Sequence, residues 1–265
     1  MRSTNVTHPS RVKIGSSTVK SISIQNEDSF KYLELSFDSH GFLTSITEKD
    51  INTTYNFRQG FFYYKGMGNS TQPSGAYIFR PAVQEAVAVA GTIKIDVIKG
   101  NLVEEVRQTL TPWLSQIIRL YKNSTHIEFD WVVGPIPKEE NREPISKEVV
   151  TRYFTDIHSE DIFFTDANGR QMMRREVNKY SSFKYDNTEP VAGNYYPISN
   201  RIYIKDAARI HRPLAVEIFN KPIIAFALLK NVTKFRQEHN LQLITEKSSN
   251  ILFECHSKII SEESR

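Results

Sequence analysis

The chain has 265 residues, of which 39% are hydrophobic and 24% charged, a composition typical of globular proteins that argues against wholesale disorder, collagen or coiled coil. Its single cysteine excludes an internal disulfide framework and any zinc site built from cysteines. The net charge of +4 arises from 34 basic and 30 acidic residues with interspersed signs, so the basic stripe that nucleic acids require is missing. No apolar run reaches the roughly 18 residues of a membrane span. The polar segment 1–13 has no apolar region of the kind that a secretory signal peptide contains, so it is not predicted to be one.

Apolar residues recur mostly with a period of two, which predicts half-buried antiparallel strands. In chain order, the alternating segments are 31–37, 92–98, 126–132 and 201–205. Turn-forming residues lie between strands at 39–41, 99–101, 166–169 and 191–194. Asn168-Gly169 is the sharpest of these signals, because both residues tolerate the positive φ of a tight hairpin.

Long amphipathic helices and internal repeats are missing from the sequence. Many strands at short spacing therefore predict an all-β fold, either an antiparallel β-sandwich or a barrel-like fold. The charged segment 138–147 is predicted to be a surface loop between strands. After a change of character at 208–213, segments 214–229 and 241–255 again have strand patterns, which predicts a second, smaller β portion near the C-terminus.

Several acidic residues could serve in glycoside hydrolysis, which needs two carboxyl groups at a fixed separation across the sugar. No local pattern singles out such a pair. Asp166 opens an Asp-Ala-Asn-Gly turn, where a carboxylate stabilises the backbone itself. We interpret the candidates as surface or turn carboxylates: Asp130, Asp156, Asp161, Asp166 and Glu189.

Metal binding and nucleophilic catalysis are the less favoured interpretations of the remaining reactive residues. The alternation places His126 with Glu128, and His158 with Glu160, on one face of a predicted strand, which is also normal for a solvated sheet face. Cys255 lies in an apolar strand pattern and is interpreted as a small buried residue rather than a nucleophile. Phosphate-binding glycine loops and the Gly-x-Ser-x-Gly elbow do not occur.

Aromatic residues make up 11% of the chain and admit two interpretations. Their rings could stack on sugars, or they could fill the core of a large sandwich, and the core is favoured for any single one. The residues in question are Tyr77, Phe79, Trp113, Trp131, Tyr195 and Tyr196.

The chain contains N-glycosylation sequons, Asn-x-Ser/Thr, in excess of the roughly three that chance would give. This excess favours a secretory protein, with glycans predicted at Asn52, Asn69, Asn123 and Asn231 in addition to a sequon at Asn5.

Six blocks, in order and at matching spacing over residues 22–207, resemble the C-terminal half of glycoside hydrolase family 38. The blocks are SGAYIFRP at 74–81, WLSQIIRLY at 113–121, IEFDWVVGPIP at 127–137, KEVVTRYFTD at 147–156, FTDANGR at 164–170 and TEPVAGNYYP at 188–197. Segments 211–227 and 241–259 resemble pieces further toward the family's C-terminus. The resemblance thus implies that several strands, one with a paired-arginine segment that lines the active site, are missing between residues 207 and 208.

The resemblance implies a galactose-mutarotase-like supersandwich that packs against an N-terminal α/β barrel and completes its substrate cleft. In the family the barrel supplies the nucleophile and binds zinc, so we expect no catalytic residue, metal or cofactor in this chain. Tyr77 is the residue implied to contact a sugar hydroxyl. Arg80 could act near the cleft, or could form a structural ion pair.

From this resemblance we expect the C-terminal domain of a retaining, zinc-dependent α-mannosidase that removes terminal α-mannose during N-glycan breakdown. Its partners would be a mannose-containing oligosaccharide and the barrel half, and its location the lysosome or secretory pathway. The chain alone would be inactive. The alternatives are a stand-alone carbohydrate-binding module and a non-functional truncated fragment.

Four parts of the chain are predicted. They are an irregular or disordered N-terminus at 1–20, the sandwich domain at 21–207, a rejoined C-terminal β segment at 208–260 and a tail at 261–265.

Overall fold

The computed structural model describes residues 22–26, 33–68, 70–75, 78–122, 124, 126–137, 146–180, 182–198 and 200–207, followed by five strand segments between 213 and 257. For the first strand and the five after residue 207, only the backbone is described. The predicted irregular N-terminus at 1–20 and the tail at 261–265 lie outside the described residues, so both stay predictions.

The first of two large sheets has seven strands in the order β1-β2-β3-β4-β10-β19, with the short β5 paired to β4. Its strands are β1 (Ile22–Asn26), β2 (Leu33–Phe37), β3 (Leu43–Glu48), β4 (Thr53–Lys65), β5 (Val87–Ala88), β10 (Lys147–Thr155) and β19 (Phe253–Ser257). The central strand β4 is 13 residues long and pairs along nine residues with β10, so these two strands share the longest pairing in the sheet.

The second large sheet has ten strands in the order β12-β11-β14-β15-β17-β16-β9-β8-β7-β6. Its strands are β6 (Lys94–Lys99), β7 (Val103–Thr111), β8 (Leu114–Tyr121), β9 (His126–Val133), β11 (Ile162–Ala167), β12 (Gln171–Glu176), β14 (Arg201–Lys205), β15 (Pro213–Ile218), β16 (Ile223–Leu228) and β17 (Phe235–Arg236). A separate two-stranded sheet joins β13 (Tyr195–Ile198) to β18 (Leu241–Ile244). Strand neighbours run antiparallel except β15 and β17. The predicted all-β antiparallel sandwich is therefore confirmed.

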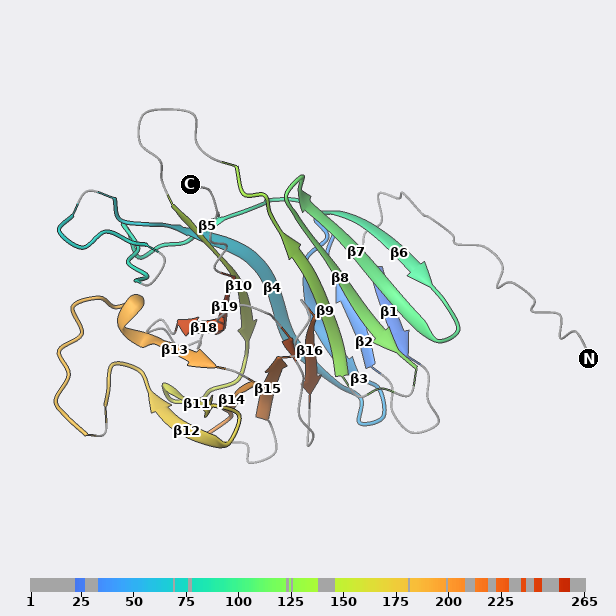
Figure 1. Cartoon of the computed structure of the whole chain (residues 1–265). Coiled ribbons are helices and arrows are strands. Elements are labelled where there is room, and N and C mark those ends of the chain that lie inside the picture. The colour runs from blue at the N-terminus through green and yellow to red at the C-terminus, as the bar shows by residue number, and fades with distance from the viewer. Residues whose placement is uncertain are drawn as a thin grey trace, which may run out of the picture.

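The two large sheets face each other, and strands β6 to β9 lie across β1 to β4 in Figure 1. The core between them takes alternate residues from both sheets, and Leu35, Ile46, Phe57, Ile118 and Phe129 are each at most 1% exposed. Each such side chain stabilises the fold by roughly 1.5–3 kcal/mol relative to an exposed one. The period-two pattern of the sequence is thus the direct cause of the two-layer architecture.

A chain of buried side-chain amides crosses this core. Gln59 and Gln116 exchange reciprocal hydrogen bonds of 3.1 and 2.9 Å, and Gln59 also donates to the Thr151 hydroxyl at 2.6 Å. Gln116 donates to Gln108 at 2.7 Å, and Gln108 donates to the carbonyl oxygen of Gly41 at 2.7 Å. Because β4 and β10 belong to one sheet and β7 and β8 to the other, these bonds fix how the two layers face each other.

The predicted turn at 166–169 forms as its residues require. Asn168 and Gly169 have φ values of 51° and 69°, the left-handed conformation that this dipeptide tolerates. The buried Asp166 carboxylate accepts the Gly169 amide at 2.7 Å and the amides of Asn200 and Arg201 at 3.0 Å. Asp166 is thus a turn-stabilising residue.

Two local predictions need correction. Residues 158–160 are not strand, because β10 has ended at Thr155 and Glu160 has a left-handed φ of 52°. His158 and Glu160 therefore do not share the face of a strand, and the prediction made from their alternation is wrong. The turn at 191–194 contains a short 3-10 helix, η1 (Ala192–Asn194), and leads into β13 before the strand at Arg201.

The backbone after residue 207 extends the two large sheets and the small one. β15 pairs with β14, β16 pairs with β9, β18 pairs with β13 and β19 pairs with β10. Segments 214–229 and 241–255 thus coincide with strands β15, β16, β18 and β19, and the predicted division at residues 207 and 208 stays a prediction. Among the described residues, the structure contains no helix long and apolar enough to span a membrane.

Candidate functional site

A long loop follows β4 and carries the SGAYIFRP block. Its base is closed by a backbone hydrogen bond from Met67 to Arg80 at 2.8 Å and by an isolated bridge between Gly66 and Pro81. A Cβ atom on Gly66 would lie 2.9 Å from Ser74 Cβ, which cannot rotate away, so a side chain at this position would force the loop to shift. Tyr77 lies outside the described residues, and its predicted sugar contact stays a prediction.

Arg80 joins this loop to a segment far along the chain. Its Nε donates to Glu189 Oε1 at 2.8 Å, a half-buried ion pair between residues 109 positions apart. Its Nη1 donates to the Ser70 hydroxyl at 3.2 Å and to the Gln72 carbonyl oxygen at 3.1 Å. The guanidinium therefore holds the loop after β4 against the segment that precedes η1, as the structural alternative expected, whereas its role near a cleft remains a prediction.

Three asparagines brace the segment that contains Glu189. The buried Asn194 side chain donates to Asn178 Oδ1 at 2.9 Å and accepts from the Asn178 amide at 2.8 Å. Asn187 donates to the same Asn178 oxygen at 2.7 Å. Asn178 itself has a φ of 59°, which asparagine tolerates better than most residues. These side-chain bonds connect the two ends of loop 177–194 to each other.

A cavity of about 430 Å³ opens beside these loops. That volume lies within the roughly 300–1,000 Å³ of small-ligand sites. Four segments of the chain line it, with the residues Gln84, Glu85, Ala86, Arg152, Asn178, Pro190, Val191 and Asn194. Amide, carboxylate and guanidinium groups of this kind suit a ligand rich in hydroxyl groups.

Arg152 is the most deeply buried cation at this cavity, at 8% exposed. Its guanidinium donates to the Tyr64 hydroxyl and lies 5.0 Å from the ring centre of Phe62 and 5.4 Å from that of Tyr64. Contacts between a cation and aromatic faces compensate in part for its loss of hydration. The charge is therefore fixed in place at the cavity wall.

The five candidate carboxylates do not gather at this cavity. Asp130 pairs with Arg119 at 3.1 Å, Asp166 holds its turn, and Glu189 pairs with Arg80. Asp156 and Asp161 are half-buried and belong to neither the cavity wall nor these pairs. The five candidates thus include no pair of carboxyl groups that faces across this cavity.

The described residues do not fit a zinc ion. His126 shares a hydrogen bond of 2.8 Å between its Nδ1 and Ser124, and Glu128 accepts from Arg119 at 2.7 Å. Within the described part of the chain, no group of three or more histidine, cysteine, aspartate or glutamate side chains is placed to hold a metal ion. For Cys255 only the backbone is described, so its predicted burial stays a prediction.

The core interpretation of the aromatic residues is confirmed for those that the structure describes. Trp131 and Tyr196 are buried in the main core, against which Trp113 packs, and Phe79 is buried in a second, smaller cluster. Tyr195 is half-buried and contacts Phe79 at 5.6 Å between ring centres. Burial raises the pKa of both Tyr195 and Tyr196, so their hydroxyl groups stay protonated at physiological pH.

Comparison with known proteins decides the family. Residues 29–216 match the profile described as the glycosyl hydrolases family 38 C-terminal domain. The chain belongs to this family. The family 38 resemblance predicted from the six blocks is therefore confirmed.

The matched relatives are much longer than this family 38 chain. It is 44% identical to lysosomal alpha-mannosidase of Mus musculus over 180 residues, which is 66% of this chain and 18% of the relative. Identity to lysosomal alpha-mannosidase of Homo sapiens is 40%, and to a probable alpha-mannosidase of Arabidopsis thaliana 37%, over 70% and 67% of this chain and 18% of each relative. The chain thus spans about a fifth of the length of these curated relatives.

A solved structure shares the fold. The crystal structure of an alpha-mannosidase from Enterococcus faecalis V583 matches with a TM-score of 0.52 and 13% identity, over 88% of this chain and 29% of that chain. At this identity the match supports the fold of the family 38 chain and nothing finer.

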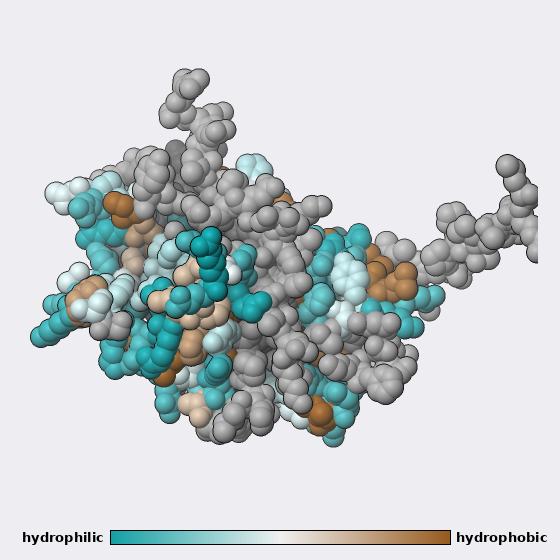
Figure 2. Space-filling model, turned by 60° about the horizontal axis from the view of Figure 1, so that its bottom comes forward, coloured by the Kyte–Doolittle hydropathy of each residue, from teal (hydrophilic) through white to brown (hydrophobic). Residues whose placement is uncertain are grey.

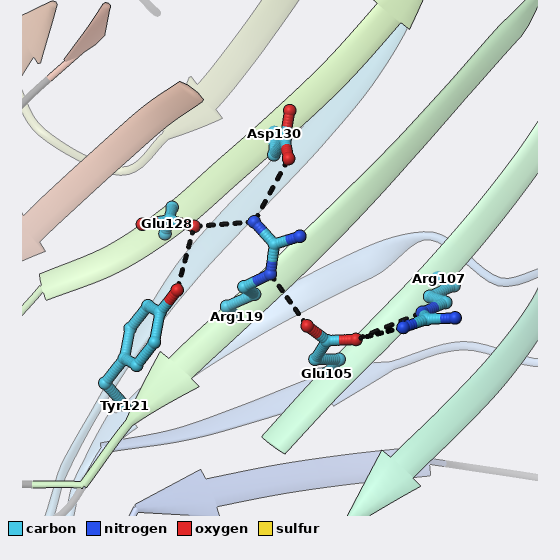
Figure 3. A network of polar contacts seen from close by, with 6 residues as sticks. All are labelled: Glu105, Arg107, Arg119, Tyr121, Glu128 and Asp130. Carbon is cyan, nitrogen blue, oxygen red and sulfur yellow. Dashed lines mark hydrogen bonds and ion pairs between the residues drawn. The ribbon is translucent and has the colours of Figure 1, made fainter. Parts of the chain in front are cut away.

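The second sheet of this family 38 domain carries an ion-pair network that the sequence did not predict. The network lies on the outer face of the sheet, away from the core. Arg119 on β8 donates to Glu105 at 2.8 Å, Glu128 at 2.7 Å and Asp130 at 3.1 Å, and Tyr121 completes the network in Figure 3. Its neighbours Ile118 and Leu120 point into the core, so Arg119 lies on the outer face. Burial and three carboxylates act on Arg119, and the carboxylates prevail and raise its pKa further.

The cavity residues Arg152, Asn178 and Asn194 were also missed. Arg152 and Asn194 lie within two of the six family blocks, but the resemblance implied site roles only for Tyr77 and Arg80. Their shared location depends on how β10 lies beside loop 177–194, and no spacing in the sequence encodes that.

Of the five sequon asparagines, the structure describes Asn52. Asn52 lies exposed in the turn between β3 and β4 with a φ of 47°. Asn5, Asn69, Asn123 and Asn231 lie outside the described residues.

Proposed function

We propose that this chain is the β-sandwich part of an α-mannosidase and supplies a wall of its substrate cleft, while the reacting groups belong to another part of the enzyme. The observation that carries the proposal is coverage: identity of about 40% to alpha-mannosidases extends over 18% of their length. Of the candidate carboxylates, Asp130 and Glu189 form ion pairs and Asp166 holds a turn, which is consistent with a structural role.

The side of the molecule that carries the loop after β4 and loop 177–194 is the proposed cleft wall. Both loops lie on the same side in Figure 1 and are joined by the Arg80–Glu189 pair. We propose that the Tyr77 phenol donates to a sugar hydroxyl there and that Arg80 keeps its loop in position for that contact. The ligand would be a mannose-containing oligosaccharide, and the compartment the lysosome or another part of the secretory pathway.

Activity of the isolated chain tests this proposal. The purified chain, supplied with zinc and an aryl α-mannoside, is expected to release no aryl alcohol above a buffer blank. Turnover that a chelator abolishes would overturn the proposal, because the described residues offer no metal site.

Association provides the second test. When the chain is mixed with a separately expressed barrel half of a related alpha-mannosidase, amide exchange is expected to slow in 66–82 and 177–194. The turn between β6 and β7 at Lys99–Val103 serves as the internal control, since it belongs to a different part of the sandwich. Equal protection of both regions, or of neither, would contradict the assigned cleft wall.

A stand-alone carbohydrate-binding module is the second candidate, favoured by the volume and polar lining of the cavity. Calorimetry with a high-mannose glycan separates the two. Heat that disappears in Tyr77→Ala supports a stand-alone module, whereas the absence of Tyr77-dependent heat at millimolar sugar favours the wall of a larger enzyme.

A further inference from the structure

Loop 177–194 carries three aromatic side chains in mutual contact. Tyr180 and Phe183 stack with ring centres 4.9 Å apart and an angle of 18° between their planes. Tyr185 meets Tyr180 edge-on at 4.8 Å and Phe183 edge-on at 6.4 Å. Phe183 nevertheless keeps 56% of its surface exposed, so the cluster does not serve to bury this ring.

The cluster is fixed to the body of the domain at two points. Tyr180 contacts the buried Tyr196 at 6.3 Å, and Tyr196 belongs to the core. The Tyr185 hydroxyl donates to Asn187 Oδ1 at 3.1 Å, and Asn187 is bonded in turn to Asn178 at the cavity wall. An exposed ring held in one orientation loses little conformational entropy when a ligand covers it.

The surroundings of Phe183 are polar. Ser182, Lys184 and Asp186 are exposed, and neither Lys184 nor Asp186 forms an ion pair among the described residues. Figure 2 likewise shows hydrophobic residues as small separate areas among hydrophilic ones, and Phe183 is one of the few large exposed hydrophobic side chains of the described residues. The exposed surface of this single phenylalanine ring is far smaller than the contact region of a protein partner.

A pyranose ring has the matching chemistry. One of its faces presents C–H groups to an aromatic surface, while its hydroxyl groups project from the rim toward donors and acceptors. We propose that Phe183, braced by Tyr180 and Tyr185, is a stacking platform for a sugar unit of an oligosaccharide, with Lys184 and Asp186 placed to bond its hydroxyls. The choice of mannose as that sugar rests on the proposed function.

Titration of the full chain with an oligomannose glycan, followed by ligand-observed NMR, tests the platform. Phe183→Ala is expected to weaken binding about five-fold or more, which is the scale of one aromatic contact. Phe183→Tyr is expected to bind like the parent, and Phe183→Leu to resemble the alanine variant, because leucine keeps apolar volume but has no aromatic face. Leu102→Ala, a change at a side chain that is 75% exposed elsewhere, is the matched control and should bind normally.

The remaining outcomes are decisive as well. Oligomannose binding that is unchanged in Phe183→Ala overturns the platform while leaving the proposed function intact. The absence of any binding to oligomannose and to glucose or galactose oligosaccharides also overturns it. Phe183-dependent binding of glucose or galactose oligosaccharides but not of oligomannose would support the platform and contradict the mannosidase assignment. Full binding by Phe183→Leu, with loss of binding only in Phe183→Ala, would indicate a hydrophobic contact and overturn sugar stacking. Circular dichroism of each variant shows whether it is folded.

Discussion

At the scale of single residues, Gly41 shows how one side chain can be excluded by backbone geometry. Gly41 has a φ of 86°, and a Cβ atom there would lie 2.7 Å from the carbonyl oxygen of Ile93. That oxygen is part of the main chain and cannot move aside as a flexible side chain would. The turn after β2 therefore requires glycine for two independent reasons.

Gly41→Ala is expected to lower the free energy of unfolding by about 2 kcal/mol or more, from left-handed strain plus the steric clash. Denaturant unfolding monitored by tryptophan fluorescence measures the loss. Gly91→Ala is the matched control, because a Cβ atom on Gly91 meets no atom within 4 Å. Equal stabilities of the two variants would show that the turn adapts to a side chain.

The sequence predicted local contacts between residues better than contacts between distant ones. The left-handed Asn168-Gly169 and the bond from the Gly169 amide to Asp166 are local, so this turn could be predicted, whereas the bonds from Asn200 and Arg201 to Asp166 could not. Arg80 and Glu189 meet across 109 positions, and neither has neighbours that indicate the other. Pairs of this kind depend on the completed fold.

At the scale of elements, the amide chain between the sheets should contribute strongly to stability. Gln116 is 1% exposed and donates to both Gln59 and Gln108. Gln116→Ala removes those donors and leaves amide oxygens buried, at an expected cost of about 2–4 kcal/mol. Equilibrium unfolding in urea measures this. Gln171→Ala, an exposed change on β12, is expected to stay within about 0.5 kcal/mol of the parent, and a similar loss there would contradict the explanation.

The ion-pair network on β7 to β9 makes the stability of that sheet dependent on pH. Burial alone would raise the pKa of Glu105, but hydrogen bonds from Arg119 and Arg107 outweigh it and hold the pKa below the ordinary 4.5. Since the folded-state pKa is the lower one, Glu105 stabilises the fold above pH 4.5, and this contribution is lost as the pH falls through the folded pKa.

Glu105→Gln should therefore reduce the difference in unfolding free energy between about pH 7 and about pH 3. Urea unfolding at the two pH values gives that difference. Glu85→Gln changes an exposed carboxylate that forms no ion pair among the described residues, and it should leave the difference as in the parent. An unchanged difference in Glu105→Gln would contradict the role given to Glu105 in the pH dependence of stability.

Elements themselves were predicted well where alternation was clean. The predicted strand 201–205 coincides with β14, and 126–132 differs from β9 by one residue. Residues 158–160 show the opposite case, because a pattern of three residues is too short to distinguish a strand from a turn with left-handed residues. Outward residues such as Arg119 were also unpredictable, since alternation identifies the core side and leaves the partners on the other face open.

At the scale of the whole molecule, the candidate site forms only when segments far apart in the sequence come together in the fold. Its cavity takes residues from 84–86, from β10 and from both ends of loop 177–194. Family blocks could locate Arg152 and Asn194 along the chain, but only the pairing of β10 with β4 and the asparagine bonds of loop 177–194 place them at one wall. The resemblance to family 38 therefore predicted the fold and the class of protein, whereas the local composition of the site required the three-dimensional structure.

Glycosylation of Asn52 tests, at the scale of the whole molecule, whether this sequon is accessible on the folded sandwich. Asn52-Thr53-Thr54 is exposed at the turn between β3 and β4, where an oligosaccharide would project from the sandwich without displacing core residues. In eukaryotic cells, with a secretory leader supplied, we expect peptide mass spectrometry to find Asn52 carrying an N-glycan. Thr54→Ala should abolish this glycan because it destroys the sequon, while Thr53→Ala alters only the middle position and should retain it. An unmodified Asn52 beside modified sequons elsewhere in the chain would contradict the expectation, and so would a glycan that survives Thr54→Ala.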